Sequence, residues 1–351
     1  MAVARDQTGG INGIKTSIIK AGGISAYSIK RDFFTITVNP TQEAPRLTRT
    51  NNLPLLDQIR EDEPDDTNPG TLVSVLLSRM TTNGGTVVDP DNFAGSGIAI
   101  IGANQLKGTW QFTTDGGANW TNFGSTSLGN ALLLASDANT RIRYQPKKDY
   151  NGDAKFTFVA WDQSDAAANG SLHAITSAGG AAAYSTGRQD AQIVVTAQND
   201  APRLNNQGTP TLNSIPSGIS NNNNGGTLVS DIIARMAPNG GITDVDISGS
   251  VNGMAIIGAD SSHGTWQFTV DAGGTWTDFG TINLGNALLL DGDSDTFLRF
   301  QPAQGFTGTA GISFIGWDET DGVHGTFQPI AAAGGTTAFS TSRDIALITV
   351  T

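Results

Sequence analysis

Cysteine is absent from this chain of 351 residues, which excludes disulfide bridges and thiolate metal sites. Histidine is scarce as well, with three residues in the whole chain. No Gly-x-Ser-x-Gly elbow, His-Glu-x-x-His helix or Walker loop occurs. The longest apolar runs, such as IAIIGA at 98–103 and NALLLAS at 130–136, are far shorter than a membrane span. We therefore expect no membrane-spanning segment and none of the chemistry that these catalytic motifs support.

Basic residues are outnumbered, because 20 lysines and arginines stand against 32 acidic residues and the net charge is −12. An acidic surface repels phosphate backbones, so we expect no nucleic-acid partner. The same carboxylates suit divalent cations. The N-terminal stretch MAVARDQTGG has no apolar run of signal-peptide length, so an exported protein would have its signal outside this chain or elsewhere in a longer gene product.

Glycine is abundant, with 44 residues, and this excess predicts many turns and many short strands. The phrase GTWQFTTDGGANW begins at Gly108, and GTWQFTVDAGGTW begins at Gly264. Residues 98–163 align with 254–319 without a gap, and roughly half of the positions are identical. Blocks that begin with Ala-Gly-Gly recur three times, at 21–38, 178–196 and 333–351. The sequence therefore predicts the last part of one repeat at 1–43 and full repeats at 44–199 and 200–351.

Each repeat is predicted to consist mainly of β-strands. Segments such as WQFT, RIRYQP, FTFVAW and AQIVVT alternate apolar with polar residues or are β-branched, and glycine, asparagine and aspartate separate them. The apolar spacing of 70–80, repeated at 226–236, predicts one short helix per repeat. The strand pattern indicates an all-β fold of tandem antiparallel β-sandwich repeats. In the incomplete repeat, 33–38 reads as a closing strand whose sandwich partners are missing from this chain.

The repeated phrase fits Ser/Thr-x-Asp-x-Gly-x-x-Trp and resembles the Asp-box hairpin of sialidases and other β-rich proteins. That resemblance implies that Asp115 and Asp271 cap a tight turn and that the tryptophans pack beneath it without a catalytic role. The alternative is a carbohydrate platform built on Trp120 and Trp276. We interpret the phrase as a structural module.

The histidines argue against an enzyme. His263 aligns with Lys107, and neither His173 nor His324 has a histidine counterpart in the other repeat. A catalytic base of a repeated active site would recur, so we predict a protein that is not an enzyme. Paired carboxylates leave glycoside hydrolysis open as an alternative.

Acidic residues recur at matching places and predict calcium sites. Calcium takes six to eight oxygen ligands from carboxylates, amides and carbonyls. Two acids separated by one residue open each full repeat, an acid follows each buried tryptophan near its end, another comes three residues later, and Asn-Asp stands in the second linker. These candidate ligands are Asp89, Asp91, Asp162, Asp165, Asn199, Asp200, Asp244, Asp246, Asp318 and Asp321.

The combination of NDAPRL at 199–204, the early Asp-x-Asp and the late Trp-Asp resembles the cadherin-like and immunoglobulin-like tandem repeats of giant bacterial extracellular adhesins and surface proteins. The resemblance covers nearly the whole chain and implies β-sandwiches with calcium at the junctions. It also implies an acid that follows the linker, a role for Glu61 or Asp62. The first linker reads NPTQEAP, with Glu43 in place of Asp200, so we expect the two junctions to bind calcium unequally.

From these features we predict a non-enzymatic extracellular rod, stiffened by calcium, that serves in adhesion or matrix assembly. Its expected partners are neighbouring repeats or identical copies, with surface polysaccharide as a further candidate. One alternative is a filament subunit joined head to tail, in which the incomplete repeat at 1–43 receives its missing strands from another copy. The second alternative is a carbohydrate-binding or polysaccharide-active module.

Overall fold

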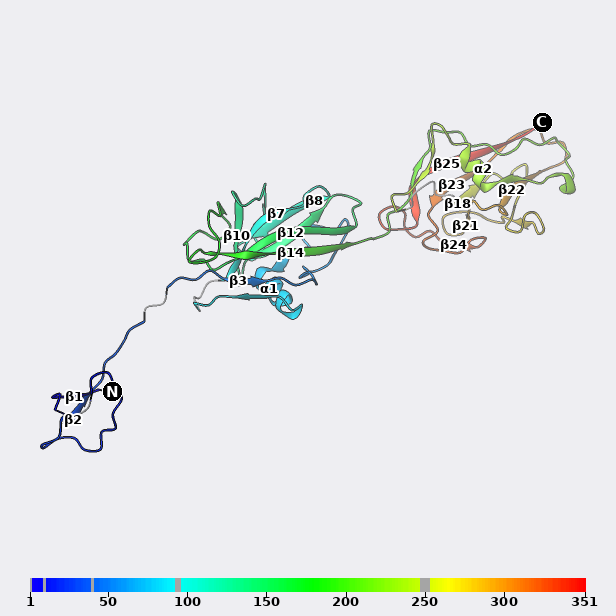
Figure 1. Ribbon diagram of the computed structural model, residues 1–351. Helices are drawn as coiled ribbons and strands as arrows, with labels where there is room; N and C mark the ends of the chain where they lie inside the picture. Colours follow the sequence, from blue (N-terminus) through cyan, green and yellow to red (C-terminus); the bar gives the residue numbers. More distant parts are fainter. Residues whose placement is uncertain (1, 9–10, 39–40, 92–95, 247–252) are drawn as a thin grey trace.

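The computed structural model describes residues 2–8, 11–38, 41–91, 96–246 and 253–351. Most of its elements are β-strands, and its α-helices are α1 (Val73–Thr82) and α2 (Val229–Ala234). The predicted all-β class is therefore confirmed. Across these ranges no helix has the length and apolar character needed to cross a membrane. The strands of the two full repeats form separate bodies that follow one another along the chain (Figure 1).

Residues 44–199, called repeat 1, form two main sheets. The larger sheet has the order β13 (Leu172–His173), β10 (Ala131–Ala135), β7 (Gly97–Ala103), β12 (Gly152–Trp161), β14 (Tyr184–Thr196) and β4 (Ile59–Arg60). The smaller sheet has the order β5 (Thr71–Leu72), β11 (Arg141–Pro146), β8 (Gly108–Thr113) and β9 (Thr121–Asn122). A separate pair consists of β3 (Arg46–Thr48) and β6 (Thr86–Val88).

Residues 200–351, called repeat 2, have a similar arrangement, but no strand among the described residues corresponds to β4. The larger sheet has the order β24 (Phe327–Gln328), β21 (Ala287–Leu290), β18 (Gly253–Ala259), β23 (Gly308–Trp317) and β25 (Phe339–Val350). The smaller sheet has the order β16 (Thr227–Leu228), β22 (Phe297–Pro302), β19 (Gly264–Thr269) and β20 (Thr277–Asp278), and β15 (Arg203–Asn205) pairs with β17 (Gly241–Thr243). A single 3₁₀ turn, η1 (Asn221–Asn223), precedes β16. Among the described strands, no sheet mixes the two repeats.

Alternation of apolar side chains along the long strands creates one main core in each repeat. In β23, Ala310, Ile312 and Phe314 point to the core and are 2%, 0% and 0% exposed. They share this core with Trp266 of β19, which belongs to the other sheet. In repeat 1 the rings of Trp110 and Phe156 meet edge to face with centroids 5.0 Å apart. The two sheets of each repeat therefore contribute to a common core.

The helices begin later than the sequence pattern predicts. In repeat 1 the predicted helix spans 70–80, whereas α1 begins at Val73. Thr71 and Leu72 instead form β5 and pair with Ile142 and Arg141 of β11. The interstrand hydrogen bonds thus take over the backbone groups that the apolar periodicity assigned to a first helical turn. Repeat 2 shows the same shift, because β16 precedes α2.

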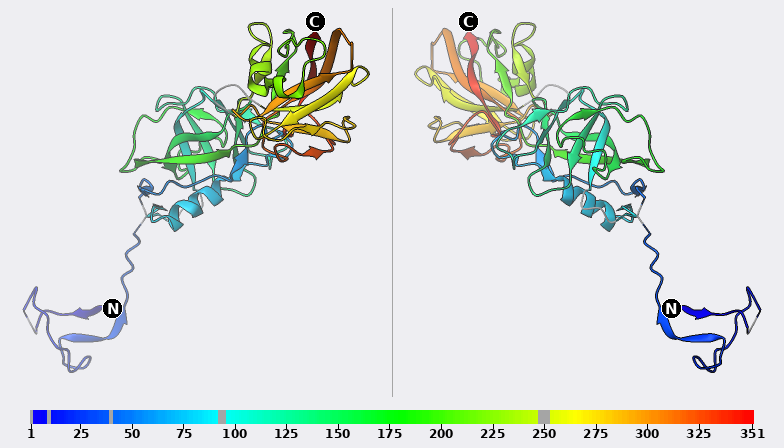
Figure 2. Two further views of the ribbon diagram at one scale, coloured as in Figure 1. Left: turned by 90° about the vertical axis from the view of Figure 1, so that its right-hand side faces the viewer. Right: turned by 90° about the vertical axis from the view of Figure 1, so that its left-hand side faces the viewer.

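The N-terminal residues form a hairpin with the register of a complete repeat. In this hairpin β1 (Ala2–Arg5) and β2 (Tyr27–Asp32) place Arg5 opposite Tyr27. Trp161 lies opposite Tyr184 at the corresponding place of repeat 1. Figure 2 shows the hairpin of β1 and β2 apart from the sheets of repeat 1. The pairing of β1 with β2 therefore matches the pairing of β12 with β14.

The predicted closing strand at 33–38 is not a strand in the structure. Phe34, Ile36 and Val38 are 83%, 86% and 83% exposed. The equivalent residues of repeat 1 begin with Ala191, which is fully buried where β14 pairs with β12. Here the described chain offers no strand for 33–38 to pair with, so its hydrogen-bonding groups face solvent and no interstrand pairing forms.

The Asp-box hairpins are confirmed as tight turns. Asp115 accepts hydrogen bonds from the hydroxyl of Thr113 at 2.6 Å and the backbone of Asn119 at 3.0 Å. Trp120 is half-buried, and its ring covers the guanidinium of Arg143 at 4.2 Å. The tryptophan therefore packs on an arginine, and its indole also lies next to Gly117 of the turn, where a Cβ would be 3.8 Å from the ring. The arrangement recurs in repeat 2, where Trp276 covers Arg299 at 3.9 Å.

Replacing Asp271 with alanine is expected to lower the melting temperature of repeat 2 by a few degrees. Hydrogen bonds from Thr269 and from the backbone of Thr275 lower the pKa of Asp271 from its ordinary value of 3.8. Its stabilising contribution is therefore present above pH 3.8 and is lost as the pH falls through the lowered folded value. Calorimetry at neutral pH tests the change, and Asp115→Ala is the matched variant that should shift repeat 1 alone. A melt that does not change would contradict the capping role.

Candidate metal sites at the repeat junctions

The second linker is held by acids of repeat 2. The side chain of Asn199 donates to Oδ2 of Asp318 at 3.0 Å, and the backbone of Asp200 donates to Oδ2 of Asp246 at 2.7 Å. Asp246 in turn donates its backbone N–H to Oδ1 of Asp244 at 2.8 Å. Five predicted ligands thus lie in one connected group around the linker.

One carboxylate oxygen in this group has no hydrogen-bond partner. Oδ2 of Asp244 is buried and unpaired. Burial, followed by the charges of Asp246 and Asp318, raises the pKa of Asp244. A buried oxygen that carries negative charge and lacks a donor is costly, and a bound cation would compensate it.

Acids at the end of repeat 1 complete the junction. Carboxylate oxygens of Asp62, Asp149 and Asp200 lie within 4.8 Å of one another. Glu61 is only 2% exposed and accepts a hydrogen bond from the backbone of Gln198 at 2.7 Å. Burial, followed by the charge of Asp149, raises the pKa of Asp200. The linker acid therefore lies between the carboxylates of both repeats.

Two basic side chains reach into the same group. Nζ of Lys148 lies 3.8 Å from Oδ2 of Asp62 and also contacts Asp149. Arg203 of repeat 2 lies 3.8 Å from Oδ2 of Asp149 of repeat 1. These pairs are mostly exposed, so each contributes about 0–1 kcal/mol. They nevertheless bring cationic groups to the carboxylates of the junction.

The first junction repeats half of this geometry. The side chain of Gln42 donates to Oδ2 of Asp162 at 2.6 Å, and the backbone of Glu43 donates to Oδ2 of Asp91. Asp91 donates its backbone N–H to Oδ1 of Asp89 at 2.9 Å, and the other oxygen of Asp89 is buried and unpaired. Asn39 and Pro40 of this linker lie outside the described residues. The half-site on repeat 1 therefore matches the half-site on repeat 2.

Two predicted ligands have other roles. Oδ1 of Asp165 accepts a hydrogen bond from the indole of Trp161 at 3.0 Å, and its other oxygen accepts one from the hydroxyl of Tyr184. The backbone oxygen of Asp321 accepts a hydrogen bond from the indole N–H of Trp317 at 2.7 Å. The structure does not bring Asp165 and Asp321 into the hydrogen-bonded groups around the linkers, and both instead fix the buried tryptophans.

Asp149 is a site residue that the sequence pattern did not single out. It lies in the turn after β11, more than 50 positions before the linker, and has no aspartate at the matching place of repeat 2, where Gly305 stands. Asp149 has a positive φ of 57°, a backbone conformation that non-glycine residues seldom adopt. This feature is visible in the structure and not in the sequence.

Comparison with protein-family models finds no match to this chain. Comparison with curated proteins finds no match either.

Proposed function

We propose that this chain is a non-enzymatic extracellular structural protein, a rod of cadherin-like or immunoglobulin-like β-sandwich repeats that calcium stiffens for adhesion or matrix assembly. The two sheets of each repeat would be the layers of the sandwich, because they share one core. The partners would be neighbouring repeats or identical copies.

The observation that carries the proposal is that carboxylates of both repeats lie at the linker: those of Asp62 and Asp149 are within 4.8 Å of the Asp200 carboxylate, and Asp246 accepts a hydrogen bond from the backbone of Asp200. Asp62 and Asp149 come from repeat 1, Asp200 from the linker, and Asp244 and Asp246 from repeat 2. Calcium prefers six to eight such oxygens at about 2.3–2.6 Å. The buried, unpaired oxygen of Asp244 is a donor of this kind. A cation held by all three segments would restrict the angle between the repeats.

The carbohydrate alternative has less support. Each repeated tryptophan is half-buried, and one face covers an arginine. The edge of Trp120 also lies close to Gly70, where a Cβ would approach the ring to 2.7 Å. One face of each ring is therefore covered by the protein itself and is not open to a sugar.

Spin-label distances across the junction test the stiffened rod, and the absence of cysteine makes site-specific labelling direct. Labels at Lys155→Cys in β12 and Asp278→Cys in β20 should give a narrow distance distribution in millimolar calcium and a broad one in EDTA. A pair within repeat 2, Asp231→Cys with Asp278→Cys, should give the same width in both. Equal widths across the junction in both conditions would overturn the proposal.

Adding Asp62→Asn and Asp149→Asn to the junction pair should leave a broad distribution in calcium. These substitutions replace two carboxylates that would face the ion with neutral amides of the same size. A distance distribution that stays broad in calcium would therefore be due to the loss of the two negative charges. Narrowing that survives both changes would place the ion elsewhere.

A head-to-tail filament is the second candidate, and the exposed apolar face of 33–38 favours it. Deleting residues 1–38 is expected to leave both melting transitions unchanged and to reduce self-association, because an unpaired apolar strand promotes association. Light scattering and electron microscopy of the deletion variant and the full chain test this. Association that is equal in both would contradict the filament.

A further inference from the structure

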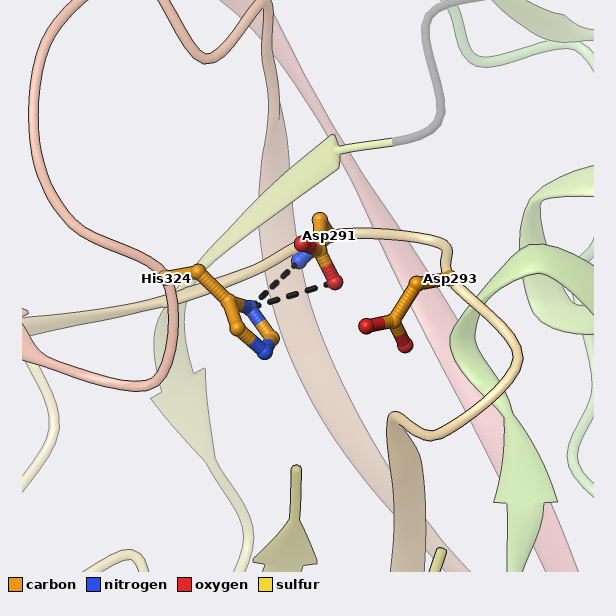
Figure 3. A group of neighbouring side chains, drawn as sticks. All are labelled: Asp291, Asp293 and His324. Atoms are coloured by element: carbon orange, nitrogen blue, oxygen red, sulfur yellow. Dashed lines mark hydrogen bonds and ion pairs between the residues drawn. The ribbon is translucent and has the colours of Figure 1, made fainter. Parts of the chain in front are cut away.

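Repeat 2 contains a cluster of metal-ligand side chains away from the junction. Asp291 follows β21, Asp293 lies in the turn between β21 and β22, and His324 lies in the loop before β24. Their ligand atoms all lie within 4.8 Å of one another, and Nδ1 of His324 is 3.2 Å from Oδ1 of Asp291. Figure 3 shows the three side chains directed toward one another from two separate loops.

Repeat 1 has the same loops without this ligand set. Asn169 stands at the place of His324, because the backbone of Ala135 donates to Asn169 Oδ1 at 2.9 Å just as the backbone of Asp291 donates to His324 Nδ1 at 3.2 Å. Ala135 therefore corresponds to Asp291. Two uncharged residues of repeat 1 are replaced by two ionisable ones that meet in space although they are 33 positions apart.

The fold of these loops does not require the ionisable residues. In repeat 1 the amide of Asn169 also donates to Thr140 at 2.8 Å and to Asp137, the equivalent of Asp293, at 3.2 Å. A neutral amide thus connects the same two loops completely. In repeat 2 His324 makes the matching contacts, with Nδ1 accepting from the backbone of Asp291 and Nε2 lying 3.3 Å from the hydroxyl of Thr296. The exchange therefore keeps the connection between the loops and adds an imidazole and a carboxylate that this connection does not require.

The charge of the cluster is poorly balanced. Glu319 stands where repeat 1 has Gln163, and loss of hydration, followed by the charge of Asp291, raises its pKa. Among the ion pairs of the described residues, no lysine or arginine contacts Asp291, Asp293 or Glu319. The junction carboxylates, by contrast, have Lys148 and Arg203. An added cation would relieve repulsion here.

We propose that Asp291, Asp293 and His324 bind a divalent first-row transition cation, with zinc as the reference ion. Imidazole nitrogen and carboxylate oxygen bind zinc at about 2.0–2.2 Å, so tetrahedral ligand atoms lie roughly 3.4 Å apart. The ligand atoms of the three residues lie within 4.8 Å of one another, and the ion would replace a hydrogen bond that an imidazole nitrogen of His324 now makes. The site differs from the all-oxygen junction, and its ion ties the β21–β22 turn to the loop before β24.

Calorimetric titration of the full chain with zinc chloride, in saturating calcium, tests the site. The wild-type chain should bind one zinc ion, and His324→Asn, which restores the residue of repeat 1, should weaken binding by more than the roughly 10–100-fold that loss of an outer-sphere partner costs. His263→Asn is the matched control and should bind as the wild type does. No zinc binding by the wild type, or unchanged binding by His324→Asn, overturns the proposal.

Introducing the same ligands into repeat 1 tests the site by a gain of zinc binding, where the previous test relies on a loss of zinc binding. The double variant Ala135→Asp, Asn169→His should gain a second zinc ion, since Asp137 is already present. Imidazole NMR signals of His324 should shift on addition of zinc to the wild type and should not shift with calcium. Zinc that perturbs only His173 or His263 would overturn the proposal even if titration detects binding.

Discussion

Calcium at a free concentration of 100 times its dissociation constant is expected to stabilise the chain by about 2.7 kcal/mol for each site that it fills. The reason is that the proposed ion would bind the ordered junction, where Asp62, Asp149 and Asp200 converge, and not the unfolded chain. Differential scanning calorimetry in EDTA and in millimolar calcium measures the effect as a rise in melting temperature.

The double variant Asp244→Asn, Asp246→Asn should lose much of this response in repeat 2, because it removes two charges beside the linker. Asp231→Asn on α2 is the control, since that acid is exposed and pairs only with Arg235 at 3.8 Å. A melting curve that is the same in EDTA and in calcium would refute calcium binding altogether.

Truncating one core side chain should unfold one repeat and leave the other intact. Phe314 is fully buried in the core of repeat 2, so Phe314→Ala is expected to destabilise that repeat by about 3–5 kcal/mol through lost burial and the cavity left behind. Calorimetry should then resolve two transitions, with the upper one unchanged from the transition of repeat 1 in the wild type.

Phe158→Ala is the reciprocal variant, because Phe158 is fully buried in the core of repeat 1. It should lower the other transition by a comparable amount. If either truncation lowered both transitions equally, the repeats would be one cooperative unit, and the division near residue 199 would be wrong.

Much of the fold could be predicted from local pattern. Alternation in FTFVAW predicted β12, and Asp115-Gly116 predicted the β8–β9 hairpin, because side-chain direction and turn conformation depend on neighbouring residues. The helix start could not be predicted this way. It depends on pairing between β5 and β11, whose residues are about 70 positions apart. The strand predicted at 33–38 was wrong for the same reason, since a strand needs a partner.

The residues of the candidate site also differ in whether local sequence could predict them. Asn199 and Asp200 are adjacent, and Asp244 and Asp246 are two positions apart, so each pair was recognisable from its spacing, although the two pairs meet only through the fold. Asp149 was not, because it joins the site only through the fold of repeat 1. Sequence spacing also could not distinguish a carboxylate at a junction from one, such as Asp165, that fixes a tryptophan ring.

Lys148 and Arg203 place two positive charges at the junction that are covalently attached to the chain. A cation from solution that enters this group competes with two tethered ones, whose effective concentration is set by the length of their side chains and not by the medium. Short tethers correspond to millimolar effective concentrations. The junction carboxylates therefore keep partial neutralisation when the surroundings contain few divalent ions, and added salt weakens that neutralisation because it screens exposed charges.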